Sequence, residues 1–184
     1  MSTTLPQYST LEEWANSVTH GLGAVLAVVG LVVMLVLTVN HGDAWQVVSA
    51  SIYGSTLIFM FLASTLYHAI QHTNTRKILR QVDHLAILYL IAGSYTPFTL
   101  VTLQGTWGWT IFGIVWGLTL IGTVLQLSPA RHIKALMVTL YLLMGWVVII
   151  AIKPLIANLE ANGLGLLVAG GLAYTGGVGF YVKK

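Results

Sequence analysis

Residues able to carry out acid–base or metal chemistry gather at one end of an apolar stretch. Ser64, His68 and His72 recur at four-residue intervals, so a continuous helix would place a hydroxyl and two imidazoles on one face. Asp83 and His84 follow a short basic loop and open the next apolar stretch. Because consecutive membrane helices meet at the same interface, Asp83 is expected to approach His68. The pattern predicts a metal site or a proton-handling site.

A second polar group begins the first apolar stretch. Glu13, Asn16 and His20 share one helical face through their i, i+3 and i+7 spacing. Ionisable groups at membrane depth are costly and are usually functional. Simpler roles compete with this interpretation, because a histidine at a helix end can snorkel, a serine can bond back to its own helix, and Asp83 can cap a helix. These alternatives stay open.

The elements that position these residues are predicted to be membrane-spanning helices. Only 7% of the residues are charged, against roughly 25% in soluble domains, and the mean hydropathy is +0.85. The predicted fold class is therefore all-α, a polytopic transmembrane helical bundle. A span needs about 20 residues. After a cytoplasmic N-terminal tail of residues 1–17, spans are predicted near residues 18–39, 45–70, 84–103, 107–127, 135–152 and 164–182.

Lysines and arginines predict the orientation, since positive loops stay in the cytoplasm. Seven lie on the side of the N-terminus and one lies opposite. The seven are Arg76, Lys77, Arg80, Arg131, Lys134, Lys183 and Lys184, and the one is Lys153. We therefore expect both termini inside.

Composition also excludes several classes of function. The sequence has no cysteine, which rules out thiolate catalysis, disulfides and zinc ribbons. A metal site would have to use His, Asp, Glu or Ser. The formal charge of +3 is explained by membrane topology, so no nucleic-acid partner is expected.

Four ordered motifs and a C-terminal run resemble the hemolysin III family, which is related to the progestin and adiponectin receptors. They are Glu12 to Gly21, Ala63 to Ala69, Asp83-His84 through Ile91 to Phe98, Tyr141 to Trp146, and Gly177 to Tyr181. The resemblance implies a seven-span fold in the bacterial cytoplasmic (inner) membrane, an inside N-terminus and a zinc site near the cytoplasmic face.

The resemblance also implies roles for individual residues. His68 would be a zinc ligand with Ser64 nearby, and Asp83 would contact the zinc-bound water. In the family, two further histidines come from a seventh span that follows a basic stretch like Lys183-Lys184. Because the sequence ends there, we expect a C-terminally truncated chain with six spans and incompletely coordinated zinc. Only proximity favours His72 or His84 as substitutes.

Two classes of function follow from the resemblance. One is a zinc-dependent hydrolase of a lipid-like amide or ester, with Asp83 as base and Ser64 orienting the water. The alternative is a pore-forming cytolysin or a receptor-like, non-catalytic membrane protein. A pore needs a polar stripe through the depth of the membrane, whereas the polar groups gather at one face. Membrane lipids are the expected partners, and the oligomeric state is not predicted.

Overall fold

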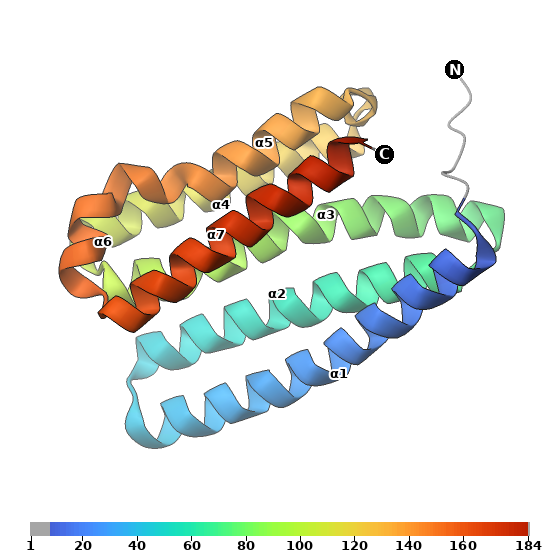
Figure 1. Ribbon diagram of the computed structural model, residues 1–184. Helices are drawn as coiled ribbons and strands as arrows, with labels where there is room; N and C mark the ends of the chain where they lie inside the picture. Colours follow the sequence, from blue (N-terminus) through green and yellow to red (C-terminus); the bar gives the residue numbers. More distant parts are fainter. Residues whose placement is uncertain (1–7, 184) are drawn as a thin grey trace. The chain divides into compact units, whose positions relative to one another are not determined.

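The computed structural model describes residues 8–183, and the side chains of residues 8–180. Every regular element in this part is a helix, which confirms the predicted all-α class (Figure 1). The α-helices are α1 Thr10–His41, α2 Ala44–Ala69, α3 Thr73–Pro97, α4 Gly105–Leu127, α5 Lys134–Trp146, α6 Ile152–Asn158 and α7 Ala161–Lys183. A π-helical segment follows α3 at Phe98–Thr102, and 3-10 segments lie at Pro129–His132 and Val147–Ala151.

Six stretches among the described residues are long and apolar enough to cross a membrane, as predicted. They are Thr10–His41, Ala44–Ala69, Thr73–Thr102, Gly105–Leu127, Lys134–Asn158 and Ala161–Phe180. Two helices begin well before the predicted spans, α1 at Thr10 and α3 at Thr73. The prediction of a basic loop was therefore wrong, because Arg76, Lys77 and Arg80 lie in the first turns of α3. Lys184 lies outside the described residues, as does the side chain of Lys183.

The chain forms two compact units, which meet in the sequence between Gly93 and Ser94. In the first unit, α1 and α2 run side by side and antiparallel (Figure 1). Each helix begins with a capping box, Ser9 with Glu12 and Asp43 with Gln46, which satisfies backbone N–H groups that a helix start leaves free. Gly54 lies so close to Leu31 that a Cβ there would clash. Small residues thus bring the two helices together.

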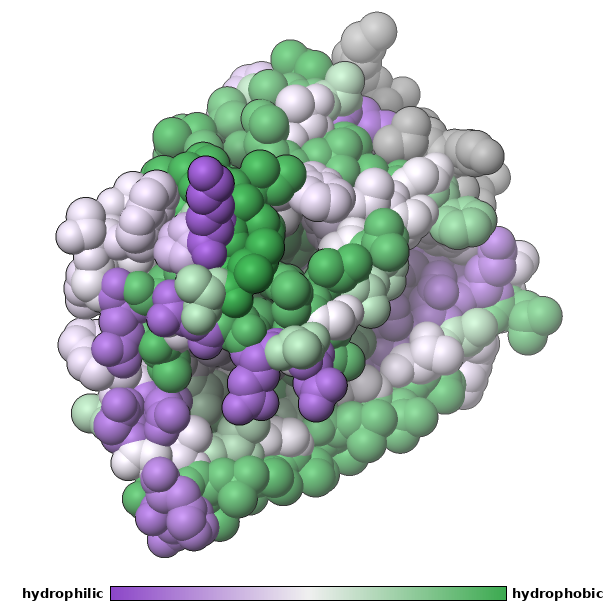
Figure 2. All heavy atoms as spheres, turned by 60° about the vertical axis from the view of Figure 1, so that its left-hand side comes forward, coloured by the Kyte–Doolittle hydropathy of each residue, from purple (hydrophilic) through white to green (hydrophobic). Residues whose placement is uncertain are grey.

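Large apolar side chains cover the outer face of this helix pair. On α1, Leu22, Val25 and Val36 are each more than half exposed. Figure 2 shows extended areas of hydrophobic side chains on the face that it draws, with the hydrophilic side chains gathered in separate groups. Such a surface suits lipid and not water.

The second unit contains two interruptions of regular helix. Pro97 ends α3 and is followed by the π-helical segment, because proline lacks the N–H that a helix interior needs. The second interruption is the 3-10 segment between α5 and α6. There the hydroxyl of Tyr95, from α3, donates to the carbonyl of Gly145 (2.7 Å) and accepts from the amide of Val148 (3.0 Å). One side chain therefore satisfies backbone groups that the broken helix frees, as lipid surroundings require.

Candidate functional site

Three helices of the first unit bring polar side chains to the end where α1 begins and α2 finishes. Glu13 lies in the first turn of α1, Ser64 and His68 in the last turns of α2, and Arg76 and Asp83 in α3. Glu13 is only 6% exposed, which is rare for a carboxylate unless it is paired. We call these five residues the polar cluster.

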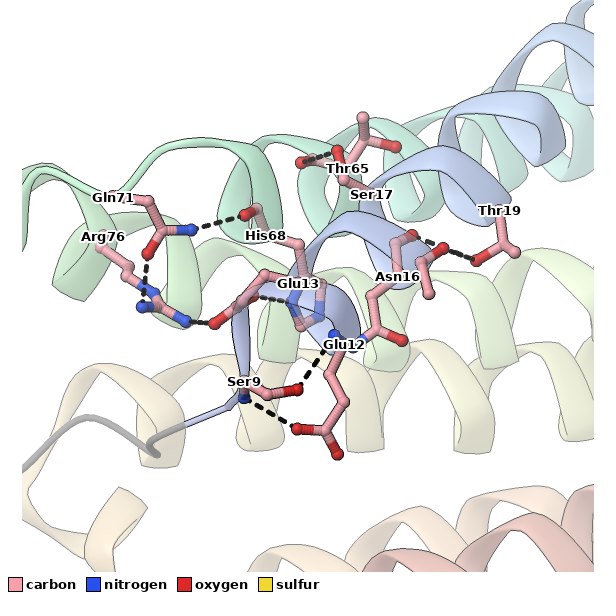
Figure 3. A network of polar contacts seen from close by, with 11 residues as sticks. Ser9, Glu12, Glu13, Asn16, Ser17, Thr19, Thr65, His68, Gln71 and Arg76 are labelled. Carbon is pink, nitrogen blue, oxygen red and sulfur yellow. Dashed lines mark hydrogen bonds and ion pairs between the residues drawn. The ribbon is translucent and has the colours of Figure 1, made fainter.

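Glu13 is the centre of the polar cluster (Figure 3). Its Oε2 atom lies 2.6 Å from Nδ1 of His68, and its Oε1 atom accepts from Nη2 of Arg76. All three side chains are nearly covered, with exposures of about a tenth or less. In an ion pair with so little solvent, each partner depends on the other. Removing one of them leaves a buried, uncompensated charge and destabilises the fold.

Arg76 is held in place by the end of α2. Its Nη1 donates to Oε1 of Gln71 (2.8 Å), and Nε2 of Gln71 donates to the carbonyl of His68 (2.8 Å). The guanidinium group also stands 5.3 Å from the centre of the Tyr67 ring, at the distance of a cation–π contact. The arginine is thus fixed on several sides.

Asp83 lies beside Ser64 and His68, as the sequence predicted. The Ser64 side chain is almost fully buried and within hydrogen-bonding reach of the Asp83 carboxyl group. His68 and Arg80 are close enough to interact with that carboxyl group electrostatically. Its Oδ1 atom is buried without a hydrogen-bond partner. Because Asp83 sits inside α3, the alternative role as a helix N-cap was wrong.

His20 approaches the polar cluster from α1. Its ring centre lies 6.3 Å from that of His68 and 5.8 Å from that of Phe61, both edge-on. Its Nδ1 atom is buried and has no hydrogen-bond partner. Asn16, one turn earlier, is half-buried and accepts through its carbonyl from Thr19 (3.2 Å).

One predicted member, His72, is not brought into the polar cluster. The prediction that Ser64, His68 and His72 share one helical face was wrong for His72, because α2 ends at Ala69. His72 is exposed, and its Nδ1 lies 3.1 Å from Oγ1 of Thr75. His84 follows Asp83 on α3, so its side chain leaves the helix about 100° away from that of Asp83, and it is close enough to Arg80 to interact with it electrostatically.

Sequence reasoning missed the site roles of Arg76, Gln71 and Tyr67. It assigned Arg76 to topology alone, because basic residues beside membrane spans usually need no other role. One signal could have found it. A carboxylate at the start of an apolar helix favours a cationic partner, and Arg76 is the first lysine or arginine along the chain.

The donor types in this region suit a transition metal, but they are not arranged as a cage. In the part of the chain that the structure describes, no three His, Asp or Glu side chains are placed to hold a metal ion. The structure places the imidazole of His68 with its Nδ1 atom bonded to Glu13. Buried, unpartnered atoms of His20 and Asp83 lie near this ring.

Fold and site together define a multi-pass helical membrane protein with a buried polar cluster at one end of its first helix pair. The chain belongs to the haemolysin III family, because the family model described as Haemolysin-III related matches residues 8–184. The resemblance predicted from the motifs is therefore confirmed.

Individual relatives agree with this assignment. The Hemolysin-3 homolog of Bacillus subtilis (strain 168) is 44% identical over 177 residues, which cover 96% of this chain and 83% of that protein. Hemolysin-3 of Bacillus cereus is 42% identical over 93% of this chain and 78% of its own length. The human Monocyte to macrophage differentiation factor is more distant, at 29% identity over 92% of this chain and 71% of its own. No solved structure matches the chain.

Proposed function

We propose that this protein is a zinc-dependent membrane hydrolase whose reaction takes place at the polar cluster. One observation carries the proposal. Two buried donor atoms, Oδ1 of Asp83 and Nδ1 of His20, have no hydrogen-bond partner and flank the imidazole of His68. Buried polar atoms are normally satisfied, and a water molecule or an ion is what usually satisfies those that the protein does not.

The donor chemistry fits zinc in kind. Zinc prefers imidazole and carboxylate ligands, and catalytic zinc commonly has three from the protein. His68 would be the first ligand through Nε2, because Nδ1 is already bonded to Glu13. The His20 ring lies near it, 6.3 Å away between ring centres, but among the described residues no three side chains are placed to hold a metal ion together.

Each residue of the polar cluster then has a role set by its surroundings. When bound, zinc would supply Lewis-acid polarisation and acidify a water molecule. Asp83 would accept a proton from that water, and Ser64, within reach of the same carboxyl group, would orient it. Glu13 and Arg76 hold the His68 ring in place.

The surroundings of the polar cluster favour a lipid-like amide or ester as substrate. Next to Glu13 on α1, Leu11 is 80% exposed and Trp14 is 67% exposed. An apolar surface with an exposed tryptophan is typical of a helix end at the membrane interface. Acyl chains can therefore lie against α1 while a polar head group reaches the polar cluster.

Metal analysis and turnover of the purified protein test this proposal. We expect bound zinc, and hydrolysis of N-acyl amide or acyl ester lipids that stops after treatment with a chelator and returns when zinc is restored. Zinc-loaded protein without hydrolysis of either class would contradict the proposal. Dye release from liposomes by protein from which a chelator has removed the metal would instead favour a pore. This is the activity suggested by the names of the bacterial relatives.

We also propose an inside N-terminus in the bacterial cytoplasmic membrane, on the basis of the lysine and arginine distribution. The absence of native cysteine allows single introduced cysteines to report sidedness. In intact cells, a membrane-impermeant maleimide should label Lys153→Cys and leave Lys77→Cys unlabelled until the membrane is opened. The reverse labelling pattern would refute this orientation.

A further inference from the structure

We infer that Glu13 and Arg76 act as a positioning pair that fixes the tautomer of His68, with the proton on Nδ1 and the lone pair on Nε2. The inference rests on the proposed function only where it takes the lone pair on Nε2 to bind zinc. The tautomer itself follows from the contacts of the described residues.

The first step is that the two carboxylate oxygens of Glu13 have different partners. Oε2 faces Nδ1 of His68 at 2.6 Å, and Oε1 accepts from Arg76. An ionised carboxylate can only accept hydrogen bonds. His68 must therefore donate from Nδ1, which leaves Nε2 of the neutral ring without a proton.

The second step is the role of Arg76. A guanidinium group stays protonated in proteins, so it keeps Glu13 ionised and holds one of its oxygens. Gln71 and the Tyr67 ring in turn hold Arg76. Glu13 cannot turn away from His68 without breaking this arrangement. The carboxylate thus acts on the histidine as second-shell carboxylates act on metal-binding histidines, by setting the tautomer and the ring orientation.

The third step is a comparison inside the same unit. Nδ1 of His20 is buried but has no hydrogen-bond partner, so nothing at that atom selects a tautomer. The two imidazoles lie 6.3 Å apart between ring centres, and both are partly buried. Among the described contacts, Glu13 bonds to His68 and not to His20. A fixed tautomer at His68 is therefore a consequence of Glu13 and not of burial alone.

Nitrogen NMR of protein labelled with ¹⁵N-histidine tests the inference without metal or substrate. At about pH 8, where histidine is ordinarily neutral, we expect the Nδ1–H form of His68 to exceed the Nε2–H form by at least about tenfold. A single charge-assisted hydrogen bond gives a bias of that size. Signals that disappear in His68→Gln identify the residue.

The isosteric change Glu13→Gln makes the test sharper. Arg76 needs the oxygen of the new amide, so the amide nitrogen must face His68 and donate to Nδ1. The tautomer ratio should therefore invert, with Nε2–H in excess. Glu12→Gln is the matched control: it lies at the exposed neighbouring position and keeps its helix-capping function, so it should leave the ratio unchanged.

The outcomes separate this inference from the proposed function. An excess of Nε2–H in the wild-type protein, both nitrogens protonated at about pH 8, or a ratio unchanged by Glu13→Gln would each overturn the inference, whether or not zinc or hydrolysis is found. The wild-type measurement stands alone if the variant does not fold. An inverted ratio in a protein without hydrolytic activity would support the inference and leave only the proposed function refuted.

Discussion

Replacing Arg76 with methionine is expected to lower the free energy of unfolding by about 3–5 kcal/mol. The reason is the buried carboxylate of Glu13, which is 6% exposed and loses its only permanently charged partner among the described contacts. Methionine keeps much of the side-chain length, so lost packing is a small part of the effect. Equilibrium unfolding of the protein in mixed micelles with increasing sodium dodecyl sulfate measures the change.

Two controls show that the effect comes from charge pairing. Lys77→Met removes a neighbouring, exposed positive charge and should change stability by less than about 0.5 kcal/mol. Combining Arg76→Met with Glu13→Gln should recover much of the loss, because the uncompensated charge is then gone. If the unfolding free energy of Arg76→Met stayed within about 0.5 kcal/mol of that of the wild type, the contact between Glu13 and Arg76 would contribute no more than a solvent-exposed ion pair does.

Replacing His68 with alanine is expected to remove bound zinc and to lower hydrolytic turnover by at least about 10²-fold, the low end for a group that takes part directly in catalysis. The imidazole is the donor that the geometry leaves open at Nε2, since Nδ1 bonds to Glu13. Elemental analysis and initial rates on the same preparation measure both effects. Unchanged zinc content together with unchanged turnover would rule out the proposed site.

Matched variants separate chemistry from folding. His68→Gln keeps a hydrogen-bond donor for Glu13 but lacks an imidazole, so it should fold and still lose zinc. His72→Ala changes a histidine four residues away that is exposed and bonded to Thr75. It should keep both zinc and turnover, although four-residue spacing alone would place the two histidines on one helical face.

Arg76 and His72 illustrate where sequence reasoning ended. Four-residue spacing placed His72 on the face of His68, but the spacing argument holds only while the helix continues, and α2 ends at Ala69. Arg76 satisfied the rule for topology and was therefore given no contact with Glu13, although it is the first lysine or arginine after that carboxylate. Its burial against Glu13 depends on the angle at which α3 leaves α2, which no local pattern encodes.

The class of the protein, the six membrane helices and the approach of Asp83 to Ser64 and His68 all follow from the sequence alone. Their cause is local: scarce charge requires lipid surroundings, apolar length requires helices, and consecutive spans meet at a shared interface. The assignment of metal and catalytic roles to these residues stays a prediction.

Only the tertiary structure decided that Glu13 joins His68 to Arg76, residues separated from it by 55 and 63 positions in the chain. Such a contact depends on how three helices are rotated about their axes and how far each extends. Side-chain packing sets both, through close approaches such as that of Gly54 to Leu31. Packing is a property of all the helices together, so the partner of a buried carboxylate emerges only when they are assembled.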